Sequence, residues 1–79
     1  MVEIYAALHA IFAEVFGREI ILSPGLSARD VAGWDSFKQI DIIMAVEARF
    51  AVEFTTAELD GLRNVGDLAR VVAARLGVV

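Results

Sequence analysis

Apolar side chains recur at helical intervals along this 79-residue chain. In the first segment, from residue 3 onward, they form one face of an amphipathic helix: Ile4, Leu8, Ile11, Phe12 and Val15. Gly17 follows this face, and a glycine at that place is typical of a helix C-terminus. Nothing in the chain alternates convincingly between apolar and polar residues, as a half-buried strand does. The pattern therefore predicts an all-α fold.

Residues 36–50 contain no glycine or proline and predict a second helix. Ser36 and Gln39 match the S-x-x-Q capping box, which predicts that Ser36 caps this helix. One stripe of the helix is wide enough to pack on a core: Gln39, Ile42, Ile43, Val46 and Phe50. We expect Ile42, Val46 and Phe50 to be structural residues.

Three more apolar residues lie on an adjacent arc of the same helix: Phe37, Ile40 and Met44. The helix is therefore apolar over more than one core face requires. Acidic residues surround this arc: Asp35, Asp41 and Glu47. Either the preceding loop covers the three apolar residues, or they form a patch that binds a partner.

Two shorter helical segments follow. Thr55 and Glu58 form a second capping box before one to two helical turns that Gly61 interrupts. Asn64 is a favourable N-cap for a last helix that Gly77 ends. One face of this last helix is apolar: Val65, Leu68, Val72 and Leu76.

The segment between the first and second helices, residues 18–33, mixes turn-forming residues with apolar anchors and predicts a long ordered loop. Loops of this length are uncommon in compact domains and tend to be functional. The expected architecture is a small bundle of three main helices plus one short helix, with a long ordered loop between helices one and two. A chain of this size forms a single domain over residues 1–79.

Charge and cysteine content exclude several classes of protein. The formal net charge of −4 leaves no basic surface for nucleic acid and favours basic partners. With no cysteine there is neither a disulfide nor a thiolate metal site, and a reducing cytoplasm fits best. No apolar run approaches the roughly 18 residues of a membrane span, and the N-terminus does not resemble a signal peptide. We expect a cytoplasmic monomer with no membrane insertion.

Catalytic residues are scarce. The single histidine, His9, lies among alanines on the first helix and is expected at its surface. Carboxylate pairs such as Glu53 with Glu58 arise by chance when 11 acids share a small surface. No calcium-binding loop pattern is present. The sequence therefore predicts neither an enzyme nor a metal site.

The segment that begins the second helix resembles the attachment motif of acyl carrier proteins. The residues that carry the resemblance are Gly33-Trp34-Asp35-Ser36-Phe37, followed by Ile40, Ile42, Met44, Glu47 and Phe50. Glu53-Phe54-Thr55 and Val65-Gly66-Asp67-Leu68 also match, so the resemblance covers nearly the whole chain. Peptidyl carriers usually show Gly-Gly-x-Ser at this place, whereas Trp34-Asp35-Ser36 favours the acyl type.

The resemblance implies that Ser36, in a motif with Asp35, receives a covalent 4′-phosphopantetheine arm from coenzyme A through a separate Mg²⁺-dependent transferase. Acyl groups would be held on the arm as thioesters, and the domain itself would catalyse nothing. Partner enzymes with basic patches would read the second helix. The expected docking residues are Phe37, Lys38, Ile40, Asp41, Met44 and Glu47.

Departures from the family pattern bear on the pathway. Phe37 replaces the usual leucine, and Lys38 stands where fatty-acid carriers generally have an acid. Ala48 and Arg49 interrupt the acidic run further along the helix. We expect Lys38 to act on partner choice and not on the fold, which favours a carrier in a specialised biosynthetic pathway.

Two alternatives remain open at the level of sequence. An S-x-x-Q box before an apolar run is often only a helix cap. The chain would then be a small helical adaptor that binds a partner helix through Phe37, Ile40 and Met44 without modification. An aminoacyl carrier is the second alternative, because the loading enzyme chooses the cargo.

Overall fold

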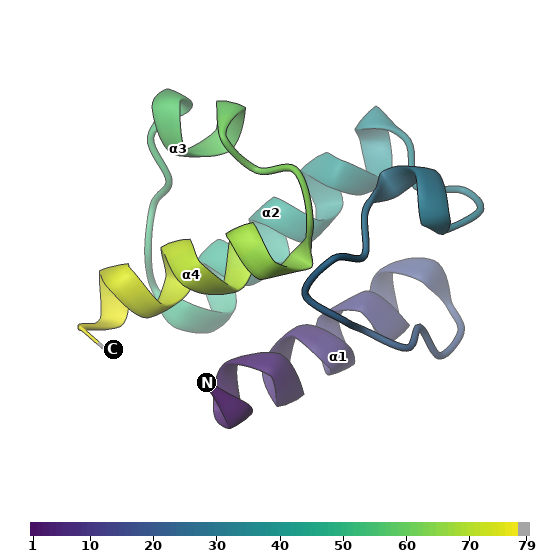
Figure 1. The fold of residues 1–79 in the computed structure, drawn as a ribbon, viewed down its shortest axis with the longest axis horizontal. Coiled ribbons are helices and arrows are strands. Elements are labelled where there is room, and N and C mark those ends of the chain that lie inside the picture. Colours follow the sequence, from purple (N-terminus) through teal and green to yellow (C-terminus); the bar gives the residue numbers. More distant parts are fainter. Residues whose placement is uncertain (78–79) are drawn as a thin grey trace.

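The computed structural model describes residues 1–77, which form four α-helices and no strand. The helices are α1 (Val2–Phe16), α2 (Ser36–Phe50), α3 (Thr56–Asp60) and α4 (Val65–Leu76). A single 3-10 turn, Ala28–Asp30, interrupts the long loop between α1 and α2. The predicted all-α bundle of three main helices and one short helix is confirmed (Figure 1).

The core lies between α1, α2 and α4 (Figure 1). Its largest side chains with less than 2% of their surface exposed are Phe12, Leu8, Ile42, Val46, Val65 and Val72. These residues come from the predicted apolar faces, because helical spacing places them on one side of each helix. The loop contributes Ile20 and Val31 to the same core.

The predicted apolar faces extend further than the core does. Leu76 is 42% exposed, and Phe50 is only half-buried at the edge of the core. Each is the last residue of its helix, where a periodic face passes the end of the neighbouring helices. The guanidinium of Arg49 lies 5.4 Å from the Phe50 ring centroid. The expectation that Phe50 is a core residue is therefore corrected to a partly covered one.

The long loop is ordered, as predicted, because it is bonded to the start of α4. Val65 donates its backbone N–H to the Leu26 carbonyl at 2.9 Å, and Gly66 donates to the Pro24 carbonyl at 2.8 Å. A Cβ atom on Gly66 would lie 2.8 Å from that same carbonyl oxygen, so only glycine permits this approach. The loop therefore holds the start of α2 and the start of α4 in fixed positions.

The short helix α3 begins and is fastened as its sequence suggests. The capping box of Thr55 and Glu58 is present, and Asn64 caps α4 by accepting from the Asp67 backbone N–H at 2.8 Å. Glu58 also accepts two hydrogen bonds from Arg75 of α4, at 2.6 and 3.0 Å. Within residues 1–77 no helix has the length and apolar character needed to cross a membrane.

Candidate functional site

Ser36 is the first residue of α2, but it is not the residue that caps the helix. Asp35 has an extended backbone (φ −112°, ψ −170°), and its Oδ1 accepts the Lys38 backbone N–H at 2.9 Å. A capping side chain needs a non-helical backbone, which Asp35 has. The prediction that Ser36 forms a capping box with Gln39 is therefore wrong by one residue.

This shift leaves the Ser36 hydroxyl free. Ser36 is exposed, and within residues 1–77 its side chain makes no hydrogen bond. The hydroxyl also lies at the N-terminus of α2, where the backbone N–H groups of the first turn and the helix dipole favour an attached anion. A phosphate on this oxygen would meet a favourable electrostatic environment.

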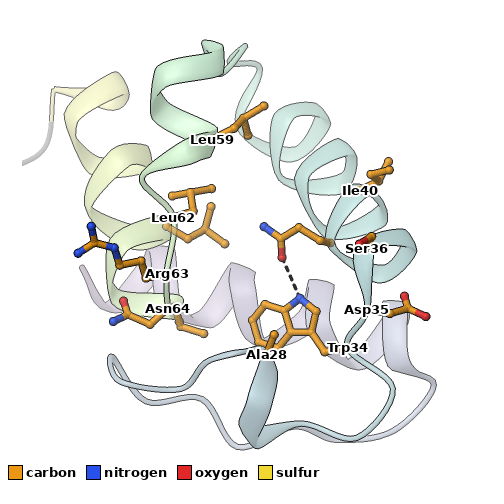
Figure 2. Close-up of a pocket in the computed structure, with 12 residues that line it drawn as sticks. Ala28, Trp34, Asp35, Ser36, Ile40, Leu59, Leu62, Arg63 and Asn64 are labelled. Carbon is orange, nitrogen blue, oxygen red and sulfur yellow. Dashed lines mark hydrogen bonds between the residues drawn. The ribbon is translucent and has the colours of Figure 1, made fainter.

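Gln39 bonds to the aromatic residue just before the motif. Its Oε1 accepts the Trp34 indole N–H at 2.8 Å, which is the dashed line in Figure 2. The Trp34 ring meets the Phe12 ring edge to face, with centroids 5.3 Å apart, and lies 6.1 Å from the Phe16 ring. The segment before Ser36 is thus anchored on α1, and Gln39 is half-buried instead of being part of the core stripe.

A pocket of about 550 Å³ opens beside Ser36 (Figure 2). It lies between the start of α2, the short helix α3 and the segment leading into α4. Its apolar lining includes Ile40, Leu59, Leu62, Val65 and Leu68. Sequence reasoning did not find this pocket, because its walls come from segments that are distant in the chain.

The three apolar residues on the second arc of α2 are exposed. Phe37 is 78% exposed, Met44 62% and Ile40 54%. The alternative in which the loop covers them is therefore wrong. Asp35 and Asp41, which were expected beside this arc, are also exposed. We refer to Phe37, Ile40 and Met44 as the α2 patch.

Two charged residues expected at the docking surface have partners inside the chain. The Lys38 ammonium donates to the Val15 carbonyl at 3.1 Å, and Glu47 accepts the Phe54 backbone N–H at 2.9 Å. Both side chains are half-buried. The expectation that Lys38 is unnecessary for the fold is therefore wrong, because its charge meets carbonyl groups at the end of α1.

The remaining titratable residue singled out by sequence, His9, is exposed on α1 as expected. Its Nε2 lies 3.9 Å from a carboxylate oxygen of Glu19. Over residues 1–77, no group of three or more histidine and acidic side chains is placed to hold a metal ion.

Comparison with known proteins gives two matches. The family model described as phosphopantetheine attachment site matches residues 6–72. The solution NMR structure of a holo acyl carrier protein from Geobacter metallireducens has a TM-score of 0.89 and 37% sequence identity to this chain. That match covers 98% of this chain and 88% of the other. None of the curated proteins matches the chain.

Proposed function

Since the chain belongs to the phosphopantetheine attachment family and is an acyl carrier protein, we propose that its covalent 4′-phosphopantetheine is attached to Ser36. The observation that carries the proposal is the free, exposed Ser36 hydroxyl at the N-terminus of α2. Ser36 also lies inside the matched residues 6–72. Like other members, the protein is a carrier and not an enzyme.

When bound, this group supplies a terminal thiol on which acyl groups are carried as thioesters. The chain's own part is to present the nucleophile and to hold the phosphate. Asp35 occupies the Lys38 N–H, whereas the N–H groups of Ser36 and Phe37 have no partner within residues 1–77 and are free to face the phosphate. No histidine stands beside Ser36, so the base that removes its proton comes from the separate transferase.

Intact mass measurement tests the attachment. The unmodified protein is incubated with coenzyme A, Mg²⁺ and a broad-range phosphopantetheinyl transferase. We expect wild type to gain one phosphopantetheine group and Ser36→Ala to gain none. Ser23→Ala, a change at an exposed loop serine, is the matched control and should be modified like wild type. Modification of Ser36→Ala, or none in wild type, contradicts the proposal.

We further propose that partner enzymes bind the α2 patch, rimmed by Asp35 and Asp41, through basic surfaces. The high exposure of the patch supports this, because isolated large apolar groups on a helix beside the attachment point favour contact with another protein. Contacts from Lys38 and Glu47 to partner enzymes remain predictions. The protein would act as a monomer in the reducing cytoplasm, consistent with its lack of cysteine.

The proposed cargo is an acyl group of a specialised biosynthetic pathway. Trp34-Asp35-Ser36, in place of Gly-Gly-x-Ser, supports an acyl over an aminoacyl cargo. Phe37 in place of leucine and Lys38 in place of an acid support partners other than those of general fatty-acid synthesis.

A further inference from the structure

The pocket beside Ser36 has one wall that differs from the others. Most of its deep lining is aliphatic, but Trp34 and Gln39 form a hydrogen-bonded pair on one side. Figure 2 shows Trp34 and Leu59 at opposite ends of the lining, with Ser36 at the edge of α2. Because Ser36 itself contributes to the lining, a flexible arm attached there begins at the rim of this pocket.

The Trp34 indole separates the pocket from the core. One side of the residue lines the pocket, and its ring meets the fully buried Phe12 ring edge to face at 5.3 Å. The hydrogen bond from its N–H to Gln39 fixes the ring against rotation about its side-chain bonds. A smaller residue at this position would join the pocket to the space beside Phe12.

The orientation of the Gln39 amide follows from the same bond. An indole N–H is only a donor, so the amide oxygen must face Trp34, and the amide NH₂ group points elsewhere. Within residues 1–77 this NH₂ group has no hydrogen-bond partner, and Gln39 lines the pocket. The end of an alkyl chain pressed against this wall would cover N–H groups without satisfying them, which is unfavourable.

We propose that the Trp34–Gln39 pair is the determinant of cargo length in this carrier: the pocket buries only short acyl groups, and the rest of a longer chain stays in solvent. This inference rests on the proposed attachment at Ser36. The indole supplies the steric stop, and the Gln39 amide makes the stop polar. Trp34 is accordingly a specificity-determining residue and not only a core aromatic.

The test is a series of acyl groups on the holo protein, with the melting temperature as readout. Butanoyl, octanoyl and dodecanoyl forms are prepared for wild type, Trp34→Leu and Trp34→Phe. A group buried only in the folded state raises the melting temperature. We expect the wild-type gain to stop rising at butanoyl. In Trp34→Leu the octanoyl gain should be roughly twofold the butanoyl gain, because each further methylene that is buried adds a similar amount. Trp34→Phe should be intermediate.

Tyr5→Leu is the matched control. Tyr5 is another half-buried aromatic residue packed against the core, but it does not line the pocket. It should keep the wild-type length profile. If Tyr5→Leu also gains with octanoyl, general loosening of the core explains the effect and the inference is overturned. If Trp34→Leu does not fold, as judged by circular dichroism, Trp34→Phe decides the result.

Fluorescence gives an independent readout, because Trp34 is the only tryptophan. Octanoylation of wild type should shift its emission as the chain end reaches the indole, and unchanged emission overturns the inference. Wild-type profiles in both Trp34 variants also overturn it, while intact masses that show the acylated arm leave the carrier function standing. Absence of the arm from Ser36 in these masses would instead overturn the proposed attachment and the inference together.

Discussion

Lys38 shows how one side chain can join two helices. Its ammonium reaches the Val15 carbonyl, in the last turn of α1, at 3.1 Å. The last turn of α1 contains no basic residue of its own. Its free carbonyl groups and the negative end of its dipole are therefore met by a cation from α2. A residue expected to act on partner choice thus also supports the packing of α1 against α2.

We expect Lys38→Gln to lower the free energy of unfolding by about 1 kcal/mol, since it removes a charged hydrogen bond at a helix C-terminus. Lys38→Glu should lower it further, because a carboxylate would face carbonyl groups. Urea unfolding followed by circular dichroism measures both changes. Lys38→Arg keeps the charge and should retain most of the wild-type stability. Equal stability of wild type and Lys38→Gln would show that this bond contributes nothing.

Single residues were also where sequence reasoning was least accurate. Asp35 and Ser36 are adjacent, and both residue types cap helices well, so the S-x-x-Q pattern selected the wrong one of the pair. The contact of Lys38 with Val15 spans 23 positions along the chain. No local pattern indicates such a bond, because it depends on how α1 and α2 pack.

Among the elements, α3 depends most on its neighbours. It has five residues, far fewer than an isolated helix needs to persist in water. Glu58 binds its own N-cap at Thr55 and the Arg75 side chain on α4. The Arg75 hydrogen bond, aided by the Thr55 backbone N–H, lowers the pKa of Glu58 from 4.5 to about 2. The carboxylate form of Glu58 therefore fastens α3.

This lowered pKa predicts an acid-dependent loss of stability. Glu58 binds protons more weakly in the folded chain, so its contribution is complete above about pH 4.5 and decreases as the pH falls towards 2. The difference in unfolding free energy between wild type and Glu58→Gln should be largest near neutral pH and approach zero near pH 2. Denaturant unfolding at a series of pH values measures it. A difference that does not vary with pH contradicts this role of the ion pair.

Helix periodicity predicted the two sides of α2 well but not the ends of the helices. Ile42 is fully buried and Met44 is 62% exposed, as their positions on the helix require. Phe50 and Leu76 continue the apolar period, yet each is a terminal residue beyond the covered part of its face. Periodicity shows which way a side chain points, whereas its burial depends on the length of the neighbouring element.

At the scale of the molecule, the net charge of −4 attracts basic partners, and the position of the charge decides how well they bind. Asp41 lies in α2 among the residues of the exposed patch. We expect Asp41→Lys to lower kcat/KM for modification by a transferase with a basic surface, roughly three- to tenfold at low salt. High salt should reduce the difference, because it screens the charges.

Asp60→Lys is the matched control for this experiment. Asp60 is an exposed acid at the end of α3, outside the α2 patch, and its substitution changes the net charge by the same amount. It should have a much smaller effect on kcat/KM. Equal losses for both variants would show that overall charge, and not the rim of the patch, governs the encounter.

The bundle as a whole was predictable, because three amphipathic segments without cysteine have few other ways to bury their apolar faces. The pocket was not. Its lining combines residues as distant as Ala28, Ser36, Leu59 and Leu68. Each of them has an ordinary local role, and only the assembled chain brings them to one cavity.

Ile40 belongs to two surfaces at once: it is 54% exposed in the α2 patch, and it lines the pocket beside Ser36. A protein that binds the patch therefore also touches the mouth of the pocket. The factor by which bound cargo strengthens or weakens that protein's binding must equal the factor by which the protein alters retention of the cargo, since such coupling is reciprocal. One isoleucine shared by both surfaces is enough to let enzymes distinguish a loaded carrier from an empty one, without any change of fold.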